Sequence, residues 1–126
     1  MQRDQAIAQL PVVIRRVQSE IRWKPASAAR HLLKRKLRGH LPADATLDDY
    51  NRMIDTVLTT DTAHVYLYWH GHDAYPTVVT VLDGNYWLVI FSWDGVLESA
   101  FVVEHPASYL IPPHFESIGL LREVLA

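Results

Sequence analysis

The second half of the chain has the period-two alternation of a β-sheet, which constrains the fold more than any other feature. His64 to His70 alternates aromatic and aliphatic side chains. Further apolar runs follow at residues 77–82, 85–93 and 96–103. The intervening turn signals are Gly71-His72-Asp73, Asp83-Gly84 and Asp94-Gly95, and Asp-Gly favours a two-residue hairpin. This pattern predicts a four-stranded antiparallel meander. Because residues 85–93 are apolar almost throughout, we expect them to be central and covered on part of both faces.

The first half has helical periodicity instead. Residues 47–58 carry apolar side chains at i, i+3, i+7, i+10 and i+11, and Thr46 precedes them as an N-cap, followed by Asp48 and Asp49 in the first turn. Residues 2–9 predict a short helix that ends before Pro11. For residues 12–24 we expect a helix followed by a short extended piece. Pro25 suits the first turn of a further helix that ends at Gly39.

The end of the chain and the composition complete the predicted fold. Pro106 opens a turn through Tyr109-Leu110, Pro112-Pro113 breaks the chain, and residues 114–125 fit a closing helix. The 126 residues, 49% of them hydrophobic, suit one domain spanning residues 1–126. The prediction is therefore an α+β fold, with N-terminal helices packed on the four-stranded meander and a short C-terminal helix.

Composition also excludes several classes of protein. There is no cysteine, so neither disulfides nor thiolate metal sites can form. No apolar run approaches the roughly 18 residues of a membrane span, and no signal-peptide pattern opens the chain. We expect a cytoplasmic protein without a membrane partner, although a toxin delivered by a larger machine has the same composition.

Residues 30–40 form a basic segment that contains five of the twelve lysines and arginines and two of the seven histidines. On a helix, His31, Lys34, Arg35 and Arg38 fall on one side, and Ala29, Leu33 and Leu37 share the other. Lys36 lies off the cationic stripe. We therefore expect the apolar stripe to be buried and the cationic stripe, with its histidine, to face solvent.

Charge is divided unevenly along the chain. Residues 1–40 contain ten Lys or Arg and two acids, for a net charge of +8, whereas residues 41–126 contain two and twelve, for −10. The overall charge of −2 therefore does not argue against a polyanionic partner, because affinity for phosphate depends on local potential. Two interpretations remain open: the positive half binds a partner, or the two halves neutralise each other within the folded molecule.

Several short blocks together resemble a known family. They are the basic helix His31 to Leu41, Trp87-Leu88-Val89-Ile90-Phe91, Asp94-Gly95, Glu98-Ser99-Ala100-Phe101 and Tyr109-Leu110. In this order, over roughly residues 23–110, the chain resembles the barnase/EndoU/colicin/RelE superfamily of metal-independent endoribonucleases and toxins, in its phage-associated and polymorphic-toxin branches. The resemblance implies a toxin-like enzyme that cleaves RNA, for example transfer RNA, and an antitoxin or immunity protein as a second partner.

The resemblance also implies which residues act. Metal-independent cleavage uses the ribose 2′-hydroxyl as nucleophile and needs a proton acceptor, a proton donor and cations. Histidine suits proton transfer because its usual pKa is about 6.5, and neighbouring cations lower that pKa. The predicted catalytic residues are His31, Lys34, Arg35 and Ser99. The predicted RNA-binding residues are Arg30, Arg38 and His40. Glu98, His40, Tyr50 and Trp87 are further candidates for acid, base or stacking roles. No metal or other cofactor is expected.

Other interpretations stay open. His31 also fits an ordinary surface histidine, the cations a solvated helix face, Ser99 and Glu98 an exposed edge strand, and Tyr50 and Trp87 simple packing. The alternative function is a non-catalytic module that binds nucleic acid or an acidic protein, and an inactive relative that associates with itself is a third. The histidines at 64, 70 and 72, with Asp73, lack further metal ligands at a recognisable spacing. A nucleophile elbow and a phosphate-binding glycine loop are both absent.

Overall fold

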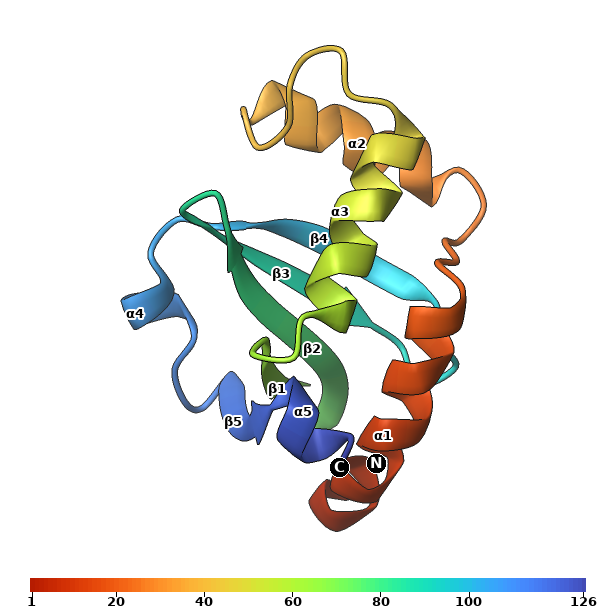
Figure 1. Cartoon of the computed structure of the whole chain (residues 1–126). Coiled ribbons are helices and arrows are strands. Elements are labelled where there is room, and N and C mark those ends of the chain that lie inside the picture. Colours follow the sequence, from red (N-terminus) through yellow and green to blue (C-terminus); the bar gives the residue numbers. More distant parts are fainter.

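A five-stranded antiparallel sheet organises the fold (Figure 1). The computed structural model describes all 126 residues. The strand order is β4-β3-β2-β1-β5, and the strands are β1 (His64–His70), β2 (Asp73–Leu82), β3 (Asn85–Phe91), β4 (Leu97–Val103) and β5 (Phe115–Leu120). The α+β class and the predicted meander of β1 to β4 are confirmed. The most apolar strand, β3, is an inner strand as expected, but the centre of the sheet is β2.

The predicted C-terminal helix over residues 114–125 is wrong. Phe115–Leu120 forms β5, which pairs antiparallel with the free edge of β1, and only one turn, α5 (Leu121–Val124), follows. Gly119 has a φ of +154°, and glycine is a poor helix former. An open strand edge supplies the hydrogen-bond partners that this segment needs. The sheet therefore has one strand more than predicted.

Helix α1 (Arg3–Ser19) continues through Pro11, so the predicted end before Pro11 is also wrong. A proline inside a helix costs about 3 kcal/mol because it removes one hydrogen bond and crowds the preceding turn. The buried side chains of α1 keep helical phase on both sides of it: Ala6, Leu10, Val13, Ile14 and Val17. Burying a Leu, Ile or Val contributes roughly 1.5 to 3 kcal/mol. The four large side chains together therefore outweigh the proline.

Helix α3 (Leu47–Thr59) forms as predicted. Its capping box is complete: the amide of Asp49 donates to Thr46 Oγ1 at 3.2 Å, and the amide of Thr46 donates to Asp49 Oδ2 at 2.9 Å. The predicted stripe is buried apart from Leu47 at its start, so that Tyr50, Ile54, Val57 and Leu58 face the sheet.

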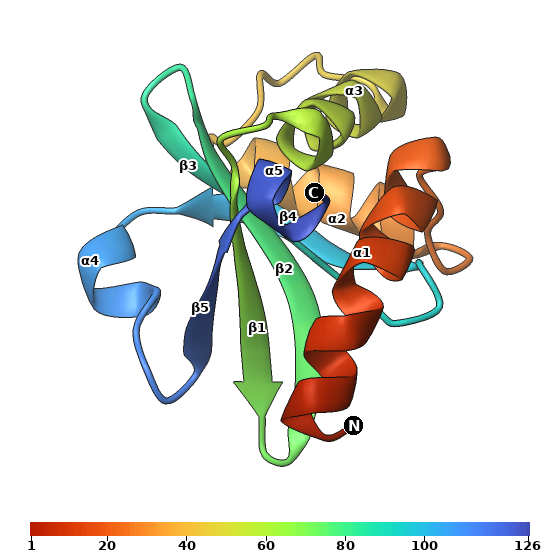
Figure 2. The same cartoon turned by 60° about the horizontal axis from the view of Figure 1, so that its bottom comes forward.

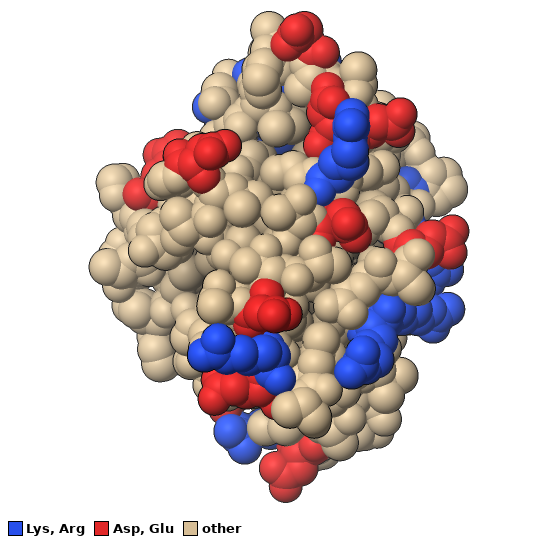
Figure 3. Space-filling model, viewed as in Figure 1, with Lys and Arg blue, Asp and Glu red and all other residues tan.

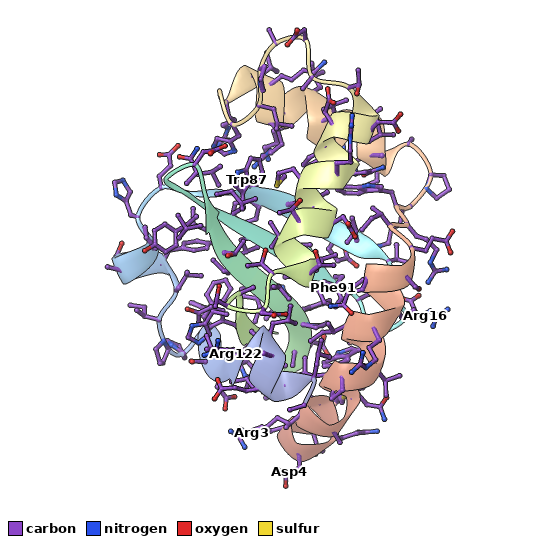
Figure 4. The ribbon with its side chains drawn as sticks, viewed as in Figure 1. Arg3, Asp4, Arg16, Trp87, Phe91 and Arg122 are labelled. Atoms are coloured by element: carbon purple, nitrogen blue, oxygen red, sulfur yellow. The ribbon has the colours of Figure 1, made fainter.

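The main core lies between the helices and one face of the sheet. It joins the buried sides of α1 and α3 to alternate residues of the strands, including Trp87 and Phe91 of β3, which project from the sheet toward the helices in Figure 4. Figure 2 shows α1, α3 and α5 together and the one-turn helix α4 (Pro106–Tyr109) apart from them. A smaller cluster on the opposite face contains Val79, Leu88, Val103 and Phe115.

No helix of the structure combines the length and the apolar character that crossing a membrane requires.

Candidate functional site

Helix α2 (Ser27–Leu37), which carries the basic segment, does not bury the side that the sequence predicted. The expected buried stripe is exposed: Ala29 faces solvent, and Leu33 and Leu37 are 57% and 79% exposed. Arg35, expected at the surface, is only 4% exposed. His31 is half-buried, and Lys34 and Arg38 remain exposed. The predicted cationic stripe therefore faces partly inward, against the edge of the sheet.

Contacts with the edge strand β4 at both ends of α2 set this orientation. Before the helix, the amide of Leu97 donates to the carbonyl of Arg22 at 2.8 Å, and Trp23 forms a parallel bridge with Leu97. After it, the amide of Val102 donates to His40 Nδ1 at 3.3 Å. Edge strands expose unpaired amides, and these two contacts satisfy two of them. These contacts hold the helix along the β4 edge. They therefore set which side of α2 faces the sheet, even though the opposite side is more apolar.

The C-terminal turn of α2 places His40. Gly39 has a φ of +73°, as the predicted C-cap requires. Its amide donates to the carbonyl of Lys36 at 3.0 Å, and the amide of His40 donates to the carbonyl of Arg35 at 2.9 Å. This pair of bonds is a Schellman motif. It reverses the chain so that the side chains of His40 and Arg35 lie next to each other.

His31 on α2 and Ser99 on β4 lie together. His31 Nδ1 is 3.4 Å from Ser99 Oγ on β4. The imidazole also packs on the Trp23 ring, with 5.3 Å between centroids, and Trp23 Nε1 donates to Asn51 Oδ1 at 3.0 Å. Burial lowers the pKa of His31, and the charges of Arg30, Arg35 and Lys34 lower it further against the opposing effect of Glu98. The neutral imidazole, which accepts a proton, is therefore favoured.

Arg35 and His40 form a second buried pair beside the first. Arg35 Nη1 donates to His40 Nδ1 at 3.3 Å, and the guanidinium carbon lies 5.6 Å from the centre of the Phe101 ring. Because His40 Nδ1 accepts from both Arg35 and Val102, the ring proton of the neutral form is on Nε2. Burial, followed by the charge of Arg35, lowers the pKa of His40. Burial also lowers the pKa of Arg35.

A groove of about 490 Å³ runs along this edge of the sheet, between α2 and α4. Five predicted residues line it: Lys34, Arg35, Arg38, His40 and Ser99. Its lining also includes residues to which the sequence assigned no role: Phe101, Val102, Val103, Glu104, His105, Ser108 and Tyr109. Tyr109 belongs to a block that carried the family resemblance. Phe101 belongs to another such block, and the remaining residues had no recognisable signal, because only the fold brings the β4 edge and α4 toward α2.

The remaining sequence candidates lie outside the groove. Tyr50 is fully buried and its hydroxyl donates to the carbonyl of Ala100 at 2.5 Å, and burial raises its pKa well above the usual value. Trp87 belongs to the main core. Glu98 pairs with Lys24 at 3.5 Å. Arg30 is exposed on α2 and does not line the groove. Tyr50 and Trp87 are therefore packing residues.

Direct ion pairs neutralise little of the positive half. Only Arg3 with Glu116, at 2.6 Å, and Lys24 with Glu98 join its lysines or arginines to carboxylates of the negative half. The five cations of the basic segment have no carboxylate within 4.0 Å. On the face in Figure 3, which α3 covers in part, positive and negative groups are intermixed and form no extended area of one sign.

The histidines of the sheet are not gathered around a common point. No three His, Asp or Glu side chains are placed to hold a metal ion. His64 instead contacts Ser117, with 2.6 Å between Nε2 and Oγ, and stacks on Tyr66.

Comparisons with models of protein families, with curated proteins and with solved structures found no match to this chain.

Proposed function

We propose that this protein is a toxin-like endoribonuclease that cleaves RNA without a metal ion. The observation that carries the proposal is the approach of His31 Nδ1 to Ser99 Oγ, 3.4 Å apart, next to a groove lined by Lys34, Arg35 and Arg38. A proton acceptor, a hydroxyl donor and cations without carboxylate partners are thus gathered at the same edge of the sheet. These are the groups that cleavage through the ribose 2′-hydroxyl needs.

In the proposed reaction, the neutral His31 takes the proton of the 2′-hydroxyl as that oxygen attacks the adjacent phosphorus. The bond from phosphorus to the 5′-oxygen breaks, which leaves a 2′,3′-cyclic phosphate and a 5′-hydroxyl. Lys34, three residues along α2 from His31, protonates the leaving oxygen. Ser99 donates a hydrogen bond to the scissile phosphate, Lys34 stabilises the charge that develops on it, and Arg35 and Arg38 add positive potential from further along the groove.

The test is incubation of the purified protein with total RNA and with transfer RNA, in the presence and absence of EDTA. Cleavage is expected in both conditions, with cyclic-phosphate ends. His31→Ala is expected to lower the rate by about 10² to 10⁴-fold, the usual contribution of a proton-transfer group. His72→Ala is the matched control, because His72 is an exposed histidine of the β1–β2 turn, outside the groove. Absence of cleavage, or equal rates for His31→Ala and the wild type, would refute the proposal.

A second candidate is a module that binds nucleic acid without cleaving it, or binds an acidic protein. The observation that favours it is the set of exposed α2 cations without carboxylate partners, including Arg30, Lys34 and Arg38. A gel shift that leaves the RNA intact and weakens steeply with salt would support RNA binding, since each neutralised phosphate contributes about −0.7 to the salt slope on single strands. An RNA that is neither cleaved nor shifted would exclude both nucleic-acid functions.

A further inference from the structure

Ser99 lines the groove, its neighbour His31 lies beside it, and the groove extends beyond this pair. Ser99, Phe101 and Val103 alternate along β4 on one face of the sheet, and all three line it. With about 3.3 Å per residue, they span about 13 Å. The far end is formed by residues of α4 and the segment before it, namely His105, Ser108 and Tyr109. A ligand that starts at Ser99 therefore passes Arg35, which lies over Phe101, before it reaches α4.

We propose that this far end is a subsite for one nucleotide next to the scissile phosphate, with its phosphate on Arg35 and Arg38 and its base against Tyr109. The inference rests on the proposed function, since it names a further part of the substrate of the same site. The groove volume of about 490 Å³ is in the range of small-molecule sites.

The phosphate half of the subsite follows from the surroundings of Arg35. Its side chain is a buried cation with no carboxylate within 4.0 Å, and its Nε has no hydrogen-bond partner. Buried charges are normally paired. The one carboxylate that lines the groove, Glu104, is 69% exposed and lies 3.9 Å from His40 Nε2. An anion from outside the chain completes the bonding of Arg35, and Arg38 adds a second cation at the same place.

The base half follows from the packing of Tyr109. Its ring is supported from within the protein by Phe101, at 6.3 Å between centroids, and by Phe115, at 5.3 Å. The residue is nevertheless 44% exposed. A supported ring with an open side is suited to stacking a nucleobase. Ser108 and His105 bring polar side chains to the same end of the groove, where the edge of a base lies.

The first experiment measures binding of inorganic phosphate, ribose 5-phosphate and adenosine and uridine 5′-monophosphates by NMR titration. Nucleotides are expected to bind about tenfold more tightly than ribose 5-phosphate, because stacking adds to phosphate binding. Tyr109→Ala should abolish this difference, whereas Tyr109→Phe should keep it. Tyr86→Ala is the matched control, since Tyr86 is a tyrosine of similar exposure that does not line the groove. Arg35→Met should weaken the binding of all these phosphate compounds.

The second experiment compares cleavage of a dinucleotide with that of trinucleotides extended on either side. The trinucleotide whose added nucleotide enters the subsite is expected to have a kcat/KM about tenfold above that of the dinucleotide in the wild type and in Tyr86→Ala. In Tyr109→Ala the extension should have no effect. Normal cleavage without any gain from extension, or nucleotides that bind no more tightly than ribose 5-phosphate, would refute the subsite. Tight binding that depends on Tyr109, without any cleavage, would refute the nuclease and leave the subsite standing.

Discussion

The helices α2 and α3 are neighbours in the chain, yet they meet the sheet with opposite kinds of surface. The inner side of α3 is entirely apolar apart from the Tyr50 hydroxyl, which is satisfied by Ala100. The inner side of α2 presents His31 and Arg35 to β4 and leaves Leu33 and Leu37 in solvent. Figure 1 shows α3 across the sheet and α2 beyond it at the β4 end.

This contrast separates an element that stabilises the fold from one that serves the site. Burying the α3 stripe lowers the free energy of the folded state without any ligand. Turning Arg35 inward and two leucines outward costs free energy, because it buries a charge and exposes apolar surface. Local rules of this kind are broken most often at functional sites. The difference predicts opposite responses to mutation in the two helices.

The largest difference is expected for apolar truncations. Ile54→Ala in α3 should lower the free energy of unfolding by about 2 to 5 kcal/mol, because it leaves a cavity in the core. Leu37→Ala in α2 should change it by less than about 0.5 kcal/mol, since the side chain is 79% exposed. Urea denaturation of the two variants measures both values. A large loss for Leu37→Ala would mean that the apolar side of α2 is covered after all.

Removing a buried polar group should give a smaller difference in stability between the two helices. Tyr50→Phe should cost about 1 to 3 kcal/mol, because the buried carbonyl of Ala100 loses its donor. The free energy of unfolding of Arg35→Met should lie within about 1 kcal/mol of the wild-type value or above it. The reason is that an apolar side chain of similar volume replaces an unpaired buried charge. The same Arg35→Met protein should bind RNA less tightly. A destabilisation by Arg35→Met as large as that by Tyr50→Phe would give Arg35 a structural role.

The smallest effect concerns pH. The pKa of His40 is lowered in the folded state, mainly by burial and then by Arg35 and Arg38, against Glu104. Between the usual pKa near 6.5 and this lowered value, the unfolded chain binds a proton that the folded chain does not. Stability is therefore complete above about pH 6.5 and declines as the pH falls, by less than about 1.4 kcal/mol per pH unit for one proton.

His40→Asn tests this dependence on pH, because the Asn oxygen can replace Nδ1 as acceptor without titrating. The free energy of unfolding, measured between pH 7.5 and 5, should fall less steeply with decreasing pH in this variant than in the wild type. Part of the slope should remain, because the pKa values of His31 and His64 are lowered as well. Helix α3 should not contribute in this range, since the Thr46 backbone hydrogen bond lowers the pKa of Asp49 below its usual acidic value. Equal slopes in the two proteins would contradict the assigned hydrogen bonds of His40.

Much of the fold followed from patterns within about a dozen residues. The hairpin dipeptides separated β2, β3 and β4, the capping residue and stripe located α3, and Gly39 located the end of α2. The predicted helix end before Pro11 and the predicted C-terminal helix in place of β5 were wrong for the same reason. The apolar stripe of α1 and the free edge of β1 decide these segments, and both act through contacts distant in sequence.

The sequence by itself determined the α+β class, the meander, and the gathering of cations and a histidine on one helix, because these depend on local periodicity and turn chemistry. Only the tertiary structure decided which side of α2 faces inward, since the unpaired amides of the β4 edge hold the helix at both ends. The tertiary structure also brought Ser99 to His31, and Tyr109 to the same groove as Arg35. Such placements depend on contacts between residues about 70 positions apart, which no local pattern encodes.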